Sequence, residues 1–337
     1  MDQKVLHDIV EQATRAPSIH NTQPWRFVAS GDVLELWTDP TRGLAVLDPN
    51  GRARHLSCGA SLLHARIAAE SAGYAAAVVL QPDPAQPEHL ADIQLTWGAT
   101  PLSGDLSEAI STRRTERGAF SSSAQRLSPE VVAALQGAAE VESCWLRVAD
   151  SSDDQTAIAV LLARADAIER DDPGYREELR RWTGQGEEAA DGVPSSAVPE
   201  GDPARRGSNF RLRDFVADRD DAAGLVDSNE SADPPPAEKP LVALLGTRDD
   251  DVLSWLAAGQ GLARLLLTAA SLGVAVSPMT QALEIPDTRA RLASELGVLG
   301  HPQMLLRLGY AVSSPATDTS PSRTPRRSVE DVLEVRD

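Results

Sequence analysis

The loop between Ala16 and Trp25 carries a dense set of short polar side chains that could contact a ligand. Pro17 and Pro24 bracket this loop and prevent the preceding helix from continuing, so its backbone is expected to be rigid. The polar side chains both donate and accept hydrogen bonds; they belong to Ser18, Asn21 and Gln23. A ligand-binding loop needs this combination, although an ordinary proline-bracketed turn would share it.

Two arginine-rich segments could bind an anion. Residues 113–117 contain Arg113, Arg114 and Arg117, and a second pair, Arg326 and Arg327, follows near the C-terminus. The planar guanidinium donates paired hydrogen bonds to phosphate, so such clusters favour a phosphate-bearing ligand even in an acidic chain. The alternative for the first segment is a solvent-exposed helix end, where arginines complement the helix dipole.

Several familiar catalytic motifs are missing from the sequence. It has no Walker A loop and no Gly-x-Ser-x-Gly elbow, and Gly259-Gln-Gly261 lacks the third glycine of a dinucleotide fingerprint. The six histidines show no metal-ligand spacing; His20 alone lies in a candidate site, where a hydrogen bond within the loop is its expected role. Cys58 and Cys144 are too few for a disulfide framework or a cysteine-rich zinc site.

The 337 residues have the composition of a globular protein, with 42% hydrophobic and 24% charged residues. This length suggests two domains or one large one. A net charge of −18 opposes binding to nucleic acid or to an anionic membrane. No apolar run reaches the roughly 18 residues of a membrane span, and the first helix is amphipathic rather than a signal peptide. We therefore expect a cytoplasmic protein.

Hydrophobic periodicity, interrupted by glycine and proline, predicts strands mixed with long helices. Helices are predicted at 3–15, 56–72, 107–114, 129–139, 155–170, 174–182, 250–272 and 287–296. Strands are predicted at 25–29, 33–37, 76–81, 93–97, 143–148, 240–246, 273–277 and 303–311. This mixture indicates an α/β or α+β domain.

Two of the predicted helices resemble each other. The stretch from Gly59 to Gly73 matches the stretch from Gly259 to Gly273 at both glycines and at several positions between them. Each is a largely apolar helix that ends at a glycine and leads into an apolar strand, so each is expected to be buried nearly all round. Chance similarity between two helices rich in Ala and Leu is the alternative; we favour duplication of one ancestral half, with the two helices packed together.

Residues 183–238 lack the periodicity of the rest of the chain and are dominated by Gly, Pro, Asp and Ser. The segment is longer than an ordinary loop, which indicates either disorder or a functional flap. Phe210, Leu212 and Phe215 would be poorly placed in a purely solvated linker. We therefore expect an ordered apolar portion at 210–215 that rests over or beside the ligand.

Four motifs in order give the chain a resemblance to the nitroreductase superfamily of flavin enzymes, and specifically to its Acg branch from mycobacteria and related actinobacteria. They are Ala16-Pro-Ser-Ile-His-Asn-Thr-Gln-Pro-Trp-Arg-Phe27, Arg113-Arg-Thr-Glu-Arg117, Ser277-Pro-Met-Thr-Gln281 and Pro325-Arg-Arg327. Each motif is weak alone. Their order, and further similarity running nearly end to end, make the resemblance specific.

The resemblance implies an α+β nitroreductase-like fold. Nitroreductases are usually homodimers with two flavin mononucleotide (FMN) sites, each built from the basic segment of one subunit and the Pro-Ser loop of the other. Here the basic segment occurs only in the second half and the loop only in the first. The implied arrangement is two fused halves, 1–104 and 105–337, forming an internal pseudo-dimer with one flavin site and 183–238 as a lid or insertion.

The resemblance also implies roles for individual residues. The phosphate and ribityl tail would be held by Arg113, Thr115, Arg326 and Arg327, and Arg117 would lie near flavin N1 and O2. The partner loop would contact the ring and tail through Pro17, Ser18, Asn21 and Gln23, with Trp25 and Arg26 following. The isoalloxazine edge would face Pro278, Met279 and Thr280, with the Thr280 backbone N–H near N5.

By this resemblance the protein is expected to be an FMN oxidoreductase that takes hydride from NAD(P)H and reduces a nitroaromatic, quinone or similar small molecule. The flavin carries the chemistry, which explains why no side-chain nucleophile is found. The alternative is a non-catalytic protein that sequesters FMN beneath the 183–238 segment. In either case the chain is expected to act as a monomeric pseudo-dimer.

Overall fold

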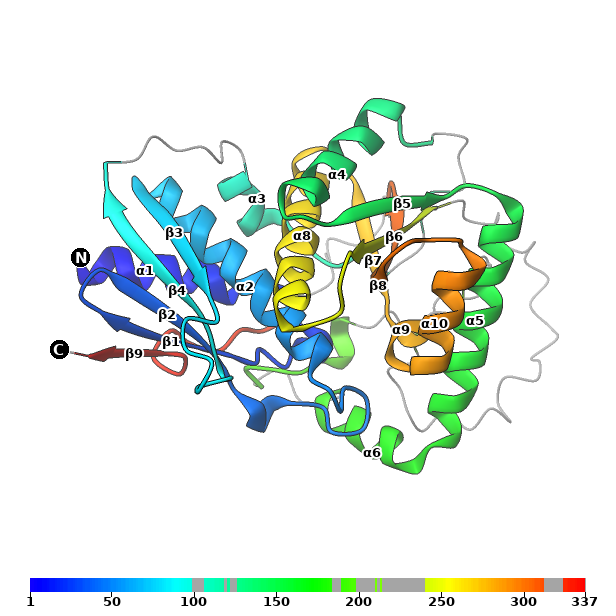
Figure 1. Ribbon diagram of the computed structural model, residues 1–337, viewed down its shortest axis with the longest axis horizontal. Helices are drawn as coiled ribbons and strands as arrows, with labels where there is room; N and C mark the ends of the chain where they lie inside the picture. Colours follow the sequence, from blue (N-terminus) through cyan, green and yellow to red (C-terminus); the bar gives the residue numbers. More distant parts are fainter. Residues whose placement is uncertain are drawn as a thin grey trace.

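The computed structural model describes residues 1–98, 106–117, 120–121, 126–183, 189–197, 210, 213, 240–311 and 324–336. Two β-sheets lie on opposite sides of a central pair of long helices, α2 (Arg52–Ser71) and α8 (Val252–Ser271) (Figure 1). Most strands pair antiparallel and do not alternate regularly with helices. The predicted α+β class is therefore confirmed.

The first sheet has the strand order β3-β4-β2-β1-β9. Its strands are β1 (Trp25–Ser30), β2 (Val33–Thr38), β3 (Tyr74–Leu80), β4 (His89–Trp97) and β9 (Leu333–Arg336). Inward-facing residues such as Phe27, Leu36 and Ile93 share one hydrophobic core with Leu62 of α2. Burial of these apolar side chains holds α2 against the sheet.

The C-terminal strand β9 returns to the first half and pairs parallel with β1, where Phe27 lies opposite Leu333. The sequence analysis placed all of 105–337 in the second half, and the structure differs at this point. The physical reason is hydrophobic burial, because Val329 and Val332 enter the core of the first half. This crossing carries Arg326 and Arg327 toward the loop that precedes β1.

The second sheet is antiparallel, with the order β5-β6-β8-β7. Its strands are β5 (Trp145–Ala149), β6 (Leu241–Thr247), β7 (Ala275–Met279) and β8 (His301–Gly309). Successive residues of β8 point to opposite faces: Leu306 enters the core shared with α8, and Leu305 enters the core shared with the helices on the outer face. Both faces of this sheet are therefore covered.

The remaining helices surround these layers (Figure 1). They are α1 (Gln3–Thr14), α3 (Leu106–Thr112), α4 (Pro129–Val141), α5 (Ser152–Asp171), α6 (Pro173–Trp182), α9 (Gln281–Glu284) and α10 (Pro286–Glu295), with short 3₁₀ turns η1 (Ile19–Asn21), η2 (Pro40–Arg42) and η3 (Ser195–Ala197). The predicted helix at 56–72 begins earlier, at Arg52, because the carboxylate of Asp48 accepts hydrogen bonds from the free N–H groups of Ala53 and Arg54. The strand β9, the short helix α9 and the 3₁₀ turns were not predicted.

The two helices that resemble each other in sequence pack together, as the sequence analysis predicted. Gly59 of α2 and Gly259 of α8 meet at the contact, where a Cβ on Gly259 would lie 2.0 Å from the Leu56 carbonyl oxygen. Both helices are followed by a glycine in the left-handed region, Gly73 (φ 87°) and Gly273 (φ 69°). The matching glycines therefore have the same structural roles in the two halves, which supports the fused two-half arrangement.

The helix α8 is long and apolar enough, by length and composition alone, to cross a membrane. Its apolar side chains are instead used in packing, since Leu256 and Leu267 lie in the core of the first half and Leu262 and Leu266 in that of the second. Its position between the two sheets accounts for its composition.

Of the irregular segment 183–238, the structure describes 189–197 and the single residues Thr183, Phe210 and Arg213. Phe210 is buried among apolar residues of α5, α9, α10 and the second sheet. Leu212 and Phe215, which the sequence analysis grouped with it, lie outside the described residues, so the predicted lid stays a prediction.

Candidate flavin site at the junction of the two halves

The Pro17–Gln23 loop has an unusual backbone. His20 (φ 47°), Asn21 (φ 56°) and Gln23 (φ 49°) all adopt the left-handed region, which non-glycine residues rarely enter. The hydroxyl of Ser18 stabilises this turn by accepting a hydrogen bond from the Gln23 N–H at 3.0 Å. Three such residues within four positions store backbone strain, and strain of this kind concentrates at ligand-binding sites.

The side chains of Asn21 and Gln23 tie together segments that are far apart in the sequence. The Asn21 amide donates to the carbonyl oxygens of Gly192 (2.9 Å) and Pro325 (3.0 Å). The Gln23 amide donates to the Ala190 carbonyl at 2.9 Å and accepts from the Arg327 N–H at 2.9 Å. The loop therefore holds the segment that contains Arg326 and Arg327 in place.

Replacing Gln23 by alanine is expected to lower the free energy of unfolding by about 1–3 kcal/mol, because Gln23 is fully buried and both its partners would lose a hydrogen bond. Chemical unfolding measures this change. Gln23→Glu is the matched control: it retains an acceptor for Arg327 and loses the donor to Ala190 and the longer bond to the Asn21 carbonyl at 3.4 Å, so its loss should be smaller. An unchanged unfolding midpoint for Gln23→Ala would show that the bridge contributes nothing.

Four arginines from three distant segments gather beside this loop. Arg326 donates to the carbonyl oxygens of Arg15 and Ala16 at 3.3 Å and to the Asn21 side-chain oxygen at 2.9 Å. Burial, together with repulsion from the guanidinium groups of Arg113, Arg15 and Arg117, lowers the pKa of Arg326 to about 9. Like charges packed this closely favour an anion among them.

The arginine cluster retains unused donors. Within the part of the chain that the structure describes, the buried Nε atoms of Arg15 and Arg326 have no hydrogen-bond acceptor. Arg15, Arg326 and Arg327 also line a cavity of about 330 Å³ between α1 and the segment 326–330. Buried N–H groups without acceptors are costly, so this donor set suits an anionic ligand.

His64 of α2 is a neighbour of this cluster that the sequence analysis did not assign to the site. It is fully buried, and its Nδ1 lies 3.2 Å from the Gln12 carbonyl oxygen. Burial lowers its pKa to about 3, with Arg113 and Arg326 acting in the same direction, so it stays neutral at physiological pH. The sequence around His64 indicated only that it lies on a buried helix. The arginines near it come from other segments of the chain, so their proximity was not predicted.

The basic segment also lies beside β7. The Glu116 N–H donates to the Val276 carbonyl at 2.9 Å, which aligns residues 113–117 with the strand that leads to Thr280. Met279 is buried in the outer core of the second sheet, and the Thr280 hydroxyl accepts a hydrogen bond from Arg213 at 3.2 Å. The structure thus places the basic segment alongside the start of β7, the strand that contains Pro278 and Met279 and leads to Thr280.

Arg213 is the centre of a second buried network that sequence reasoning missed. Its guanidinium donates to Tyr175, Glu284 and Glu169, and Nη1 lies 3.3 Å from Nε2 of His20. Burial lowers the pKa of His20 to about 3, and the charge of Arg213 acts in the same direction. This network adjoins both the Pro17–Gln23 loop and Thr280.

Comparison with known proteins decides which family this arrangement represents. The model of the nitroreductase family matches residues 110–310. The chain is 37% identical to "Putative NAD(P)H nitroreductase Rv3131" of Mycobacterium tuberculosis H37Rv, over 99% of this chain and 92% of that protein. It is 32% identical to "Putative NAD(P)H nitroreductase acg" of the same strain, over 98% of this chain and 96% of that protein.

This chain belongs to the nitroreductase family. Among solved structures it is similar to the FMN-dependent nitroreductase NfnB from Mycobacterium smegmatis in complex with NADPH, at 18% identity and a TM-score of 0.39, over 70% of this chain and all of that one. A nitroreductase with bound FMN from Bacteroides fragilis is similar at 14% identity and a TM-score of 0.36, over 65% of this chain and 98% of that one.

Not every residue singled out in this nitroreductase-family chain joins the cluster. Arg26 lies on β1, pairs with Glu334 of β9 at 3.2 Å and is exposed. Trp25 is fully buried in the core of the first half, so it anchors the C-terminal end of the loop by packing. Thr115 is half-buried within the basic segment. Arg26 therefore serves better as a control than as a candidate ligand contact.

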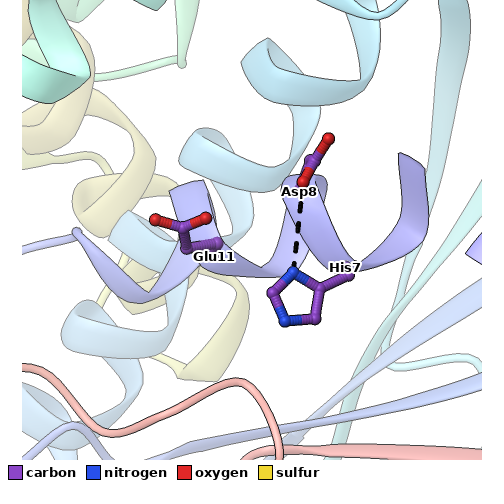
Figure 2. Close-up of side chains that lie close together, drawn as sticks. All are labelled: His7, Asp8 and Glu11. Carbon is purple, nitrogen blue, oxygen red and sulfur yellow. Dashed lines mark ion pairs between the residues drawn. The ribbon is translucent and has the colours of Figure 1, made fainter. Parts of the chain in front are cut away.

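Two groups of side chains among the described residues are close enough to hold a metal ion. Figure 2 shows one of them, His7, Asp8 and Glu11, on α1. Its carboxylates already pair with cations, Asp8 with Lys4 at 2.6 Å and Glu11 with Arg15 at 3.0 Å. The other group is Glu35, His89 and Asp92 on the first sheet. We assign no metal to either group.

Proposed function

We propose that this nitroreductase-family protein binds one FMN between its two halves and uses it as an NAD(P)H-dependent oxidoreductase in the cytoplasm, acting as a monomeric pseudo-dimer. The observation that carries the proposal is the convergence of Arg15, Arg113, Arg117 and Arg326 on the Pro17–Gln23 loop. These residues come from both halves of the chain, and a phosphate dianion would neutralise their repulsion.

The residues present fit the phosphate end of FMN. Buried Nε atoms of Arg15 and Arg326 lack acceptors in the described part of the chain, and phosphate oxygens would supply them. In this proposal Arg113, Thr115, Arg326 and Arg327 hold the phosphate and ribityl oxygens. The names of relatives as NAD(P)H nitroreductases, and of similar structures as FMN proteins, agree with the assignment.

The protein's own residues would supply position and charge rather than acid–base chemistry. When bound, FMN would accept hydride at N5 from NAD(P)H and deliver electrons to a small-molecule acceptor such as a nitroaromatic or a quinone. The charge of Arg117 would stabilise negative charge on the ring, and the Pro17–Gln23 loop would orient it. Pro278, Met279 and Thr280 would lie along its edge.

A second candidate function, sequestration of FMN without turnover, is favoured by the position of Arg213. Its guanidinium contacts both Thr280 and His20, so Arg213 of the irregular segment lies beside the proposed flavin edge. A segment held there would restrict access to N5, as the predicted lid at 183–238 requires.

Anaerobic mixing of the purified protein with NADPH or NADH separates the two functions. The protein is expected to carry about one FMN per chain, since each half-site occurs once, and an oxidoreductase should lose its visible flavin absorption rapidly. Absorption that persists with both nucleotides would favour sequestration. A content near two flavins per chain, or no affinity for FMN, would contradict the proposed site.

A further inference from the structure

We propose that Glu169, Tyr175 and Glu284 form a recognition pocket for a small organic cation, a guanidinium or a protonated amine, and that Arg213 occupies this pocket as an internal ligand. Because Arg213 contacts Thr280, the pocket would lie on the side of the flavin that the electron acceptor approaches. Only this placement rests on the proposed function. The three residues that define the pocket, Glu169, Tyr175 and Glu284, have no contact with FMN in the proposed function.

The pocket is built from hydrogen-bond acceptors that converge on one guanidinium. Oxygen atoms of Glu169, Tyr175, Thr280 and Glu284 all accept from Arg213. The guanidinium carbon also lies 5.5 Å from the centre of the Tyr175 ring, within the range of a cation–π contact. Only a planar cation with several N–H donors satisfies such a set.

The walls of the pocket belong to the folded core rather than to the segment that fills it. Glu169 lies on α5 and Glu284 on α9, and both helices pack against the second sheet. Tyr175 lies on α6, which packs against Leu44 and Leu47 of the first half. The side chains of Glu169 and Glu284 are 6% and 3% exposed. Two carboxyl groups buried this deeply require a cation or a proton between them.

Charge balance agrees with occupation by one cation. Although burial would raise the pKa of Glu284, Arg213 holds it below its ordinary value. Burial and the neighbouring carboxylate of Glu284 raise the pKa of Glu169 above its ordinary value. The opposite directions favour a proton on Glu169 and the negative charge on Glu284, which a single guanidinium neutralises.

The pocket also has acceptor capacity that Arg213 does not use. Arg213 donates to Oε2 of Glu284, and no hydrogen bond from Arg213 to the buried Oε1 is found within the described residues. A guanidinium placed face to face with this carboxylate would engage both oxygens, the geometry that arginine–carboxylate pairs favour. A ligand free of the chain could adopt it.

The test removes the internal ligand and offers an external one. Full-length Arg213→Ala is titrated with methylguanidinium at low millimolar concentrations, with binding measured by calorimetry and by the melting temperature. We expect saturable binding and a rise in melting temperature that the wild-type protein does not show. Tetramethylammonium, which has the charge but no N–H donors, should bind at least roughly tenfold more weakly.

Arg213→Ala/Glu284→Gln provides the matched control, because it keeps the shape of the pocket and removes its charge. Its affinity for methylguanidinium should fall at least roughly tenfold. No saturable binding to Arg213→Ala, or equal affinity in the double variant, would overturn the proposal. If Arg213→Ala does not fold, methylguanidinium should restore its circular dichroism, and failure to do so would equally overturn it. None of these measurements depends on FMN, so this inference and the proposed function can fail separately.

Discussion

Replacing Arg113 by alanine is expected to raise the dissociation constant for FMN by roughly 10- to 150-fold while leaving that for riboflavin nearly unchanged. The lost contact is a charge-assisted hydrogen bond to phosphate, which contributes about 1.5–3 kcal/mol, and riboflavin has no phosphate. Arg113 suits this test because its guanidinium lies in the arginine cluster, close enough to Arg326 to lower the pKa of that group. Fluorescence titration of the flavin-free protein with both flavins measures the effect.

Arg26→Ala is the control for this experiment, because Arg26 lies on β1 and pairs with Glu334 away from the cluster. It should leave both dissociation constants unchanged. If Arg113→Ala weakened FMN and riboflavin equally, the phosphate would have to lie elsewhere and the arginine cluster would lose its assigned role.

Replacing Gly259 by alanine is expected to lower the free energy of unfolding by about 3 kcal/mol or more, the upper end for an overpacked core. The new Cβ would lie 2.0 Å from the Leu56 carbonyl oxygen and 2.9 Å from the Cα of Gly59, both of them rigid backbone atoms. The helices α2 and α8 would have to separate, which would also move the first-half loop away from the second-half arginines. Urea unfolding and FMN affinity should therefore both report the change.

Gly137→Ala supplies the matched control. Gly137 lies within α4, and a Cβ there would meet nothing within 4 Å, so this substitution should stabilise the protein by up to about 1 kcal/mol through helix propensity. If the two variants unfolded at the same urea concentration, the stability of the protein would not depend on close contact between α2 and α8.

The sequence by itself determined where the long helices form and which two of them correspond. The pattern of apolar residues located α2 and α8, and the matching glycines at the two ends of each stretch predicted that these helices are equivalent and pack together. Local signals of this kind are reliable because a glycine or a helical repeat has the same physical consequence in any surroundings. The family was identifiable for the same reason, since its motifs are short and continuous in the chain.

The tertiary structure alone decided how the segments of the site meet. The resemblance placed Arg326 in the same site as the loop that contains Asn21, but the residues around Arg326 did not indicate that β9 would pair with β1 and bring this arginine to Arg15. The pocket around Arg213 was equally hidden, because Glu169 and Glu284 are 115 residues apart and ordinary in their own helices. Burial, repulsion and charge pairing depend on neighbours in space, and those neighbours are set only when hydrophobic packing brings distant segments together.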